Sequence, residues 1–392
     1  MNLGIPSSLR SRPARAAIFG GTAVVAAAAV TVSLTLTHSA AAAKPALARL
    51  SASSCTGPAG AAYIALPGYQ AFDAVNSANC ELIQQYNVAD PPVPNTGTSD
   101  TNYSSTDEGV AMYGNTLYFA DTGNDTVAVL DSAALNVDNY SNPAETLIPV
   151  GVNPTTVAVT PGGSQVWVGD TGPQTDGRSL ADIKVISTAS NTVTSTLKLP
   201  TDPRAIAFSP SGSTAYVTTG EGLYVIDTAR LRVESVIGRL GDPEGVVVSP
   251  DGKTVYVTNT EQSLVDVISA ARQRVIGTIG VGQMPWQLAL SSNGSTLYVA
   301  DGDSNAVSVV STASGKVTST ISDAGDPVSV ALTPDGSELW VGGLTSGIVS
   351  VFSTANGSLV GTFNVGYGGE ANAGDGEEPT GIVLTSTPTP GS

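Results

Sequence analysis

Six polar or aromatic residues of this chain follow prolines, or occupy the corresponding positions of a repeated pattern. The set holds two carboxylates, a guanidinium, an indole and two hydroxyls: Glu108, Arg204, Glu244, Trp286, Thr155 and Thr380. Convergent polar groups beside an aromatic wall are what a small-ligand pocket requires. The carboxylates could also serve as a base or as metal ligands, and the guanidinium could stabilise a developing oxyanion. Both kinds of chemistry require a fold that gathers residues far apart in the sequence.

The histidine content narrows the kinds of active site that the chain can build. His38 is the only histidine, and it lies in an N-terminal segment that we expect to be removed. A mature chain without histidine cannot use a Ser-His-Asp or Cys-His arrangement, a histidine metal ligand, or imidazole as general acid or base.

That N-terminal segment, residues 1–43, has the features of a secretory signal peptide. Three arginines between positions 10 and 15 are followed by an uncharged, mostly apolar run over 16–37, and residues 41–43 offer an Ala-x-Ala cleavage site. The apolar run is also long enough to span a bilayer, so an uncleaved anchor is the alternative. We therefore expect a secreted, extracellular protein, or one at the cell surface if the segment is retained.

The acidity of the chain restricts its partners. The formal net charge is −17, and all 33 acidic residues lie outside the expected signal segment. Such a surface repels nucleic acid and anionic membranes. We expect neither of these as a partner, and no cofactor. We expect a monomer that meets a small ligand or a surface protein.

Short segments flank the part of the chain that we expect to fold. Residues 44–60 are predicted to form a flexible stem, and residues 386–392 a disordered tail. Cys55 and Cys80 are the only cysteines, and an even number in an exported chain predicts a disulfide. Two free buried thiols are the alternative.

An internal repeat of about 40 residues determines where the candidate residues must lie. Its most recognisable unit is an apolar strand with an aromatic at the second place, as in Val255-Tyr256-Val257-Thr258-Asn259. The aromatics at this place are Tyr63, Tyr118, Trp167, Tyr216, Tyr256, Tyr298 and Trp340. Another strand precedes each unit, opened in most repeats by a proline, and two more follow it. We expect the aromatics to pack between repeats.

Four short strands joined by tight turns are typical of a propeller blade. Complete blades are predicted over 109–150, 154–199, 203–240, 243–281, 285–323 and 327–365. The strands within 61–88 and the strand 379–385 supply one more blade between them. We therefore predict an all-β, seven-bladed β-propeller over 61–385, with four-stranded antiparallel blades. Pairing of the C-terminal strand with the three N-terminal strands closes the ring and leaves no open edge.

The tetrapeptide Tyr256-Val257-Thr258-Asn259, set in this sevenfold register, resembles the YVTN-repeat family of seven-bladed propellers over about residues 61–385. The resemblance implies an exported or cell-surface protein, because family members are often of that kind. Many members have no assigned reaction. Propellers of similar architecture include lactonases that hold a divalent metal, or a catalytic arginine and glutamate, in the central channel.

Long predicted connections over 89–108, 171–181 and 366–378 fall on one face of such a propeller, and long loops on a rigid scaffold often carry function. With histidine absent, the chain is expected to be a non-catalytic binding module that uses this face and the channel mouth. The alternative is a lactonase-type hydrolase that uses the carboxylates and Arg204 of the mouth, with or without a divalent metal. Asp121, Asp170, Asn259 and Asp301 end the second strands, and we expect them to bond their own loops as Asx turns.

Overall fold

The computed structural model describes residues 61–66, 71–77, 81–87, 109–132, 146–172, 181–322, 325–344, 347–365 and 381–385. The chain divides into two compact units, 1–45 and 46–392, and every described residue belongs to the second. The predicted signal peptide, stem and tail lie outside the described residues, as do Cys55, Cys80, Glu108 and Thr380. Within the described ranges, no helix is long and apolar enough to cross a membrane.

The described part of the chain forms seven four-stranded antiparallel sheets. The blade built from both chain ends contains β1 (Ala61–Leu66), β2 (Ala71–Asn76), β3 (Glu81–Asn87) and β28 (Gly381–Thr385). The next two contain β4 (Val110–Tyr113), β5 (Thr116–Asp121), β6 (Thr126–Asp131) and β7 (Thr146–Pro149), then β8 (Pro154–Val159), β9 (Gln165–Asp170), β10 (Asp182–Ser187) and β11 (Thr192–Lys198).

Four further blades continue the order. They contain β12 (Pro203–Phe208), β13 (Thr214–Thr219), β14 (Gly222–Asp227) and β15 (Arg232–Gly238), then β16 (Pro243–Val248), β17 (Thr254–Asn259), β18 (Leu264–Ser269) and β19 (Arg274–Gly280). The last two contain β20 (Pro285–Leu290), β21 (Thr296–Asp301), β22 (Ala306–Ser311) and β23 (Lys316–Ser322), then β24 (Pro327–Leu332), β25 (Glu338–Gly343), β26 (Ile348–Ser353) and β27 (Leu359–Asn364). Two 3₁₀ turns, η1 (Thr122–Asn124) and η2 (Gly302–Ser304), follow β5 and β21.

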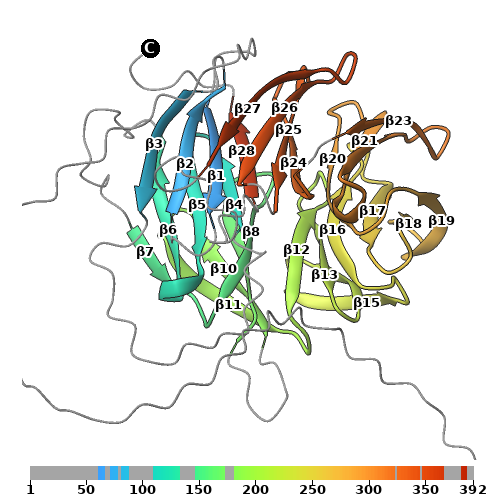
Figure 1. Cartoon of the computed structure of the whole chain (residues 1–392). Coiled ribbons are helices and arrows are strands. Elements are labelled where there is room, and N and C mark those ends of the chain that lie inside the picture. The colour runs from blue at the N-terminus through green and yellow to red at the C-terminus, as the bar shows by residue number, and fades with distance from the viewer. Residues whose placement is uncertain are drawn as a thin grey trace, which may run out of the picture. The chain divides into compact units, whose positions relative to one another are not determined.

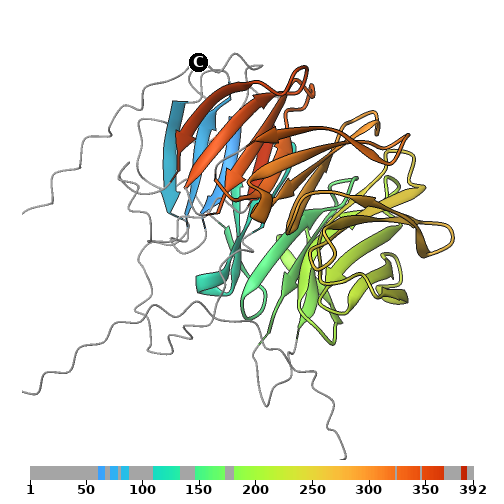
Figure 2. The ribbon, with the colours of Figure 1, turned by 45° about the vertical axis from the view of Figure 1, so that its right-hand side comes forward.

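The ring closes as the sequence predicts. The innermost strands contact one another in the order β4, β8, β12, β16, β20, β24 and β28, and β28 returns to β4. Strand β28 also pairs antiparallel with β1, with Ile64 opposite Ile382, so the red and blue ends of the chain lie side by side (Figures 1 and 2). This pairing gives β1 a strand on each side and completes the four-stranded blade that closes the ring.

The core lies between neighbouring blades, and the second-strand aromatics form much of it, as predicted. All seven of these aromatics are buried. Tyr216, for example, packs with Val255 and Val257 of the following blade. The rings of Trp167 and Phe208 meet edge to face across a blade boundary, with centroids 5.4 Å apart. Such a pair contributes about 1 kcal/mol beyond the area that it buries.

Each inner strand from β8 to β24 begins with a proline and then slips in register. Pro203, Pro243 and Pro285, for example, lie opposite the last residue of the second strand of their blade, and the ladder shifts immediately after each proline. A bulge of this kind turns side chains away from the regular pleat, and bulges are common at the rims of closed sheets. The residue after the proline therefore occupies an equivalent position in each of these inner strands.

Candidate functional site

The structure places four of the six predicted ring residues at equivalent positions of four inner strands. Thr155, Arg204, Glu244 and Trp286 are the second residues of β8, β12, β16 and β20, and all four are half-buried. Their shared position follows from the proline-and-bulge pattern that opens each inner strand. The remaining two, Glu108 and Thr380, lie outside the described residues.

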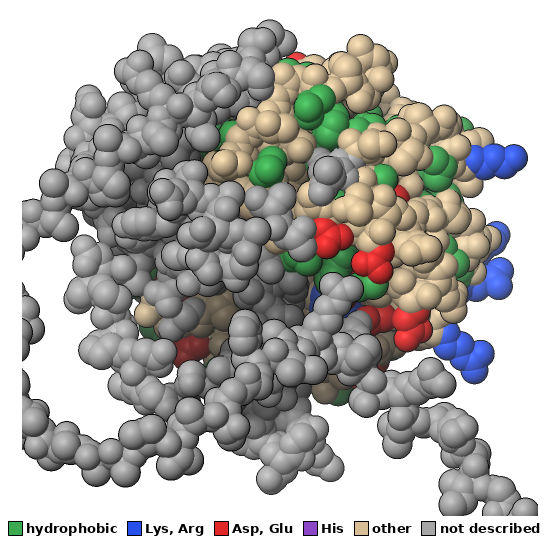
Figure 3. Space-filling view, in the orientation of Figure 1, with side chains coloured by type: hydrophobic (Ala, Val, Ile, Leu, Met, Phe, Trp, Pro, Cys, Tyr) green, Lys and Arg blue, Asp and Glu red, His purple; other side chains and the backbone are tan. Residues whose placement is uncertain are grey.

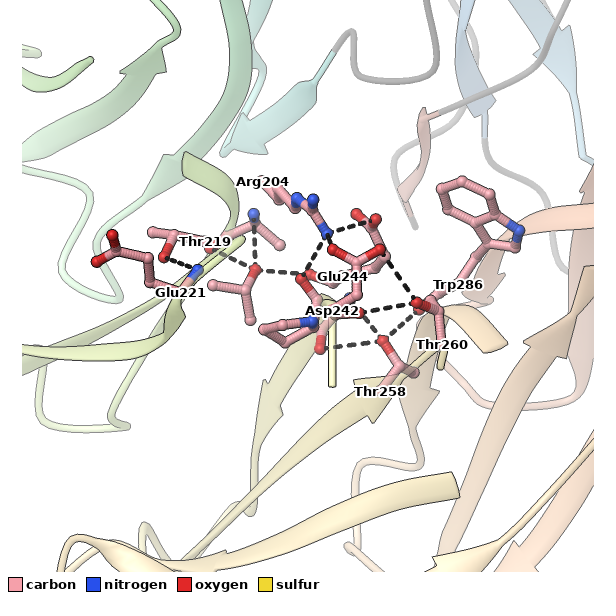
Figure 4. A network of polar contacts seen from close by, with 12 residues as sticks. Arg204, Thr219, Glu221, Asp242, Glu244, Thr258, Thr260 and Trp286 are labelled. Atoms are coloured by element: carbon pink, nitrogen blue, oxygen red, sulfur yellow. Dashed lines mark hydrogen bonds and ion pairs between the residues drawn. The ribbon is translucent and has the colours of Figure 1, made fainter. Parts of the chain in front are cut away.

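The centre of the candidate site is an ion-paired cluster on two neighbouring blades. Arg204 Nη1 lies 2.7 Å from Glu244 Oε1 and 2.7 Å from Asp242 Oδ1, and 3.3 Å from the Pro243 carbonyl oxygen. The Arg204, Asp242 and Glu244 side chains are 24%, 18% and 15% exposed, so all three remain within reach of a ligand. Figure 4 shows Arg204 of β12 meeting Glu244 of β16 and Asp242, which immediately precedes β16.

Asp242 was not among the residues predicted from the sequence. It precedes Pro243 and has a left-handed backbone, with φ of 59°, a conformation that Asp tolerates better than most residues. Its carbonyl oxygen accepts hydrogen bonds from Thr260 N at 3.4 Å and Thr260 Oγ1 at 2.9 Å. These bonds hold the turn so that the carboxylate faces Arg204. The motif Gly-Asp-Pro was a signal for this turn, but the sequence argument considered only the residues that follow prolines.

Buried threonines support the site from behind. Thr218 Oγ1 donates to the carbonyl oxygen of Glu244 in the next blade at 2.6 Å, and Thr258 Oγ1 donates to that of Trp286 at 2.7 Å. Each threonine also accepts a backbone N–H from its own inner strand, from Ala205 and Gly245 respectively. The backbones of Glu244 and Trp286 are therefore fixed by hydrogen bonds that cross between blades.

Trp286 and Thr155 share the strand position of Arg204 and Glu244, and each contacts groups outside the ion-paired cluster. The indole of Trp286 lies against Gly302, where a Cβ would be only 2.9 Å from Nε1, and it lies to one side of the two carboxylates (Figure 4). Thr155 Oγ1 lies 3.4 Å from the Gly169 carbonyl oxygen and 3.3 Å from that of Pro203. Its hydroxyl is thus directed at the backbone.

The cluster supplies two of the functions that acyl-group hydrolysis requires. Arg204 is a permanent cation that can stabilise an oxyanion, and a carboxylate beside it can accept a proton from water. The donor set does not fit a divalent metal, because Asp242 and Glu244 are both engaged by Arg204. Within the described ranges, no group of three or more Asp, Glu, His or Cys residues could hold a metal ion.

The acids and amide at the second-strand ends bond their own loops, the third strand, or both. Asn259 bonds its loop, since its Oδ1 accepts the N–H of Gln262 at 3.0 Å, but this bond spans three residues and is not an Asx turn. Its Nδ2 also donates to Asp266 of the third strand at 3.2 Å. Asp121 accepts a side-chain bond from Asn124 of its loop at 2.8 Å, and Asp170 and Asp301 face the third strand at Lys184 and Ser308. Burial raises the pKa of Asp301 to about 6, although hydrogen bonds from Ser308 and Gly282 oppose the shift. Burial and the neighbouring Asp182 raise the pKa of Asp170 to about 8.

Comparisons with known proteins bear on both fold and activity. Residues 152–333, somewhat less than half of the chain, match the family described as lactonase, 7-bladed beta-propeller. Hydrazine synthase of Kuenenia stuttgartiensis is similar at 23% identity and a TM-score of 0.54, over 63% of this chain and 76% of that chain. A functionally unknown protein of Desulfotomaculum acetoxidans DSM 771 is similar at 15% identity and a TM-score of 0.62, over 83% and 98% of the two chains. No curated protein matched the chain.

The two structural similarities support the propeller fold alone, because both identities are low. The family match corrects the expectation of a non-catalytic binding module, since it favours a hydrolase-type propeller. The matched segment contains Thr155, Arg204, Asp242, Glu244 and Trp286. The expectation was wrong because it rested mainly on the missing histidine, and a carboxylate with a guanidinium can perform base and oxyanion chemistry without imidazole.

Proposed function

We propose that this propeller is a lactonase-type hydrolase whose active site is the cluster of Arg204, Asp242 and Glu244 at the channel mouth. The observation that carries the proposal is the guanidinium held 2.7 Å from each of two carboxylates, within the segment that matches the lactonase propellers. The repeat resembles the YVTN type, and the N-terminal segment supports action outside the cytoplasm.

In the proposed reaction, the ring carbonyl oxygen of a lactone accepts an N–H of Arg204. Glu244 takes a proton from a water molecule as the water oxygen attacks the carbonyl carbon. The developing oxyanion is stabilised by the guanidinium. When the ring C–O bond breaks, Glu244 returns the proton to the departing ring oxygen, and the product is an open-chain hydroxy acid. Asp242 positions Arg204 and does not itself exchange a proton.

The charge distribution favours an uncharged ester such as a lactone over an anionic substrate. Acidic side chains gather near the middle of the face in Figure 3, whereas basic side chains lie toward its outer edge. Exposed basic residues open the outer strands, as at Arg232 of β15, Arg274 of β19 and Lys316 of β23. An anion approaching the mouth would meet net negative charge, and a neutral ring would not.

The test is hydrolysis of a panel of γ- and δ-lactones by the purified full chain, followed as acid release at constant pH. Glu244→Gln is expected to lower kcat by a factor of about 10² or more, because it removes the base. Arg204→Met is expected to lower it by a similar factor, because it removes the oxyanion donor. Asp242→Asn should have a smaller effect, mainly on kcat, because Arg204 keeps its second partner.

Two residues of the outer strand β15 provide matched controls. Arg232→Met and Glu234→Gln make the same chemical changes at exposed positions, and both should leave hydrolysis unchanged. Thermal melting of each variant separates loss of catalysis from loss of folding. If no lactone is hydrolysed by the folded wild-type chain, or if Arg204→Met and Glu244→Gln retain full activity, the proposal is wrong.

A further inference from the structure

A pocket of about 470 Å³ lies beside Asp301, in the blade that contains β20 to β23. Its lining combines backbone and small side chains with hydroxyl groups, notably Gly282, Ser308, Thr320 and Ser322. Thr320 and Ser322 are exposed, so the pocket opens to solvent. The pocket is separate from the Arg204 cluster, which contributes none of its lining residues.

A buried carboxylate lines this pocket. Asp301 is 0% exposed, and Ser308 Oγ donates to its Oδ2 at 2.5 Å. Its Oδ1 has no hydrogen-bond partner among the residues that the structure describes. Gly282 presses against the same carboxylate, since a Cβ there would lie 2.6 Å from Oδ2. Burying a carboxylate with one oxygen unpaired is costly, so this arrangement requires a physical reason.

The blade that contains β8 to β11 has a buried carboxylate at the same register position. Strand β10 pairs with β9 so that Asp182 lies opposite Asp170 and Lys184 lies opposite Val168. Strand β22 pairs with β21 so that Ala306 lies opposite Asp301 and Ser308 lies opposite Val299. Asp301 therefore corresponds to Asp170, and Ser308 corresponds to Lys184.

Lys184 supplies a cation to the carboxylate in the first of these blades. Its Nζ lies 3.6 Å from Asp170 Oδ2 and 2.8 Å from Asp182 Oδ1, and its side chain is only 14% exposed. Its Cε also lies close to Gly151, 3.3 Å from where a Cβ would stand. Gly151 presses on Asp170 as Gly282 presses on Asp301. The lysine thus fills, in its blade, the region that corresponds to the Asp301 pocket.

The outer strands of these two blades differ in the same way as their third strands, with a lysine in one blade and a serine in the other. Lys198 of β11 lies opposite Asp182 and bonds to it, whereas the corresponding pair in the other blade is Ser322 opposite Ala306. Between the two blades, the two lysines are replaced by serines, and the buried aspartate at the end of the second strand is retained. The result is an open pocket lined by a carboxylate, with no Lys or Arg among its lining residues.

We propose that the Asp301 pocket binds an alkylammonium group, which occupies the place that the Lys184 ammonium holds in the blade of β8 to β11. A single carboxylate matches a monovalent cation better than a divalent metal, which prefers several oxygen ligands. Hydroxyls of Ser308 and Thr320 can accept the remaining N–H groups, and Val281 and Val317 provide apolar surface for the alkyl chain. The group can belong to a free amine or to the lysine side chain of a peptide. This site is independent of the proposed hydrolase activity.

The experiment measures binding to the full chain by calorimetric titration with two charged probes and their neutral counterparts. The charged probes are n-pentylammonium, for a free amine, and Nα-acetyl-lysine amide, for a peptide lysine. The neutral counterparts are 1-pentanol and Nα-acetyl-norleucine amide, and potassium chloride serves as an inorganic cation. Binding of either charged probe, with binding of its neutral counterpart at least about tenfold weaker, is expected because hydrogen bonds to a charged group are strong. The charged probe that binds more tightly shows whether the alkylammonium group belongs to a free amine or to a peptide lysine.

Two variants test the assignment of the carboxylate. Asp301→Asn keeps the shape of the side chain and should weaken binding by about tenfold or more. Ser308→Lys rebuilds the arrangement around Asp170, so it should block the probes and raise the melting temperature. Asp303→Asn, at an exposed position two residues away, is the matched control and should bind normally.

The proposal is overturned by any of four results. These are failure of both charged probes to bind, equal binding of the neutral counterparts, unchanged binding by Asp301→Asn, and binding of potassium in preference to the amines. Melting curves of each variant show that a lost titration signal reflects the pocket and not unfolding.

Discussion

The buried carboxylate of Asp301 should make the stability of this propeller depend on pH in an unusual direction. Burial raises the pKa of Asp301 to about 6, with hydrogen bonds from Ser308 and Gly282 opposing the shift. The folded state therefore holds the proton more tightly than the unfolded state, in which an Asp has a pKa of about 3.9. The stabilising contribution is fully present below about pH 4 and is lost as pH rises through about 6.

The magnitude follows from the shift. A difference of about two pKa units corresponds to about 3 kcal/mol, at about 1.4 kcal/mol per unit. Most of this change, about 2 kcal/mol, falls between pH 4 and pH 7.5. Asp301→Asn removes the titration and keeps an acceptor for Ser308. The free energy of unfolding of Asp301→Asn, minus that of the wild type, should therefore rise by about 2 kcal/mol over this range.

Urea denaturation at closely spaced pH values measures this difference, because all other titrating groups are common to both proteins. Asp303→Asn is the control. It removes the same formal charge from an exposed position, so its difference from the wild type should stay nearly constant with pH. Parallel pH profiles for wild type and Asp301→Asn would show that burial does not perturb this carboxylate, and the argument from its burial would then fail.

Three further substitutions test the packing of the ring. Lys184→Met should lower the free energy of unfolding by about 3 to 5 kcal/mol, because Asp170 loses its cation and Asp182 keeps only the exposed Lys198. Lys253→Met, at a side chain that is 81% exposed, should change it by less than about 1 kcal/mol in the same urea assay. Gly302→Ala should displace the indole of Trp286, which would appear as a shift in tryptophan emission and about 1 to 3 kcal/mol of destabilisation; unchanged emission would contradict the contact. Thr258→Val should lower the free energy of unfolding by about 1 to 3 kcal/mol, because the carbonyl oxygen of Trp286 loses its hydrogen-bond donor. An unaltered urea midpoint would show that this bond does not contribute to stability.

The fold was predictable because its determinants are local and repeated. A proline before an apolar strand and an aromatic at the second place of the next strand recur through most of the chain, so each repeat confirmed the register of the others. The closure of the ring followed from the same register, since the strand pairing of Ile64 with Ile382 completes a blade that neither end could form alone. Catalysis and ligand binding, in contrast, depend on the distances between side chains of different blades, and the sequence pattern of a single repeat does not predict these distances.

The candidate site was predicted only in part from the sequence. Arg204 and Glu244 were identified because they follow prolines, but their partner Asp242 was not, since its role depends on a left-handed turn with φ of 59°. The supporting hydroxyls of Thr218 and Thr258 cross from one blade to the next. Their sequence positions are ordinary strand positions, and only the assembled ring shows which carbonyl oxygens they reach.

In a repeat protein, residues at equivalent positions of different blades can be compared directly, and both sites are recognised by such a comparison. Every blade must pack its neighbours, so features shared by all blades, such as the second-strand aromatics, report on folding. A charge that is kept at one register position while its partner is lost does not serve packing, because a buried carboxylate without a cation is destabilising. Asp301 is such a charge, and Asp170 with Lys184 shows the paired arrangement from which it departs. The same reasoning separates Arg204 from Thr155: they share one position in the fold, but only the guanidinium meets two carboxylates there. In this ring, activity is expected where a blade departs from the repeat at a cost in stability that packing does not explain.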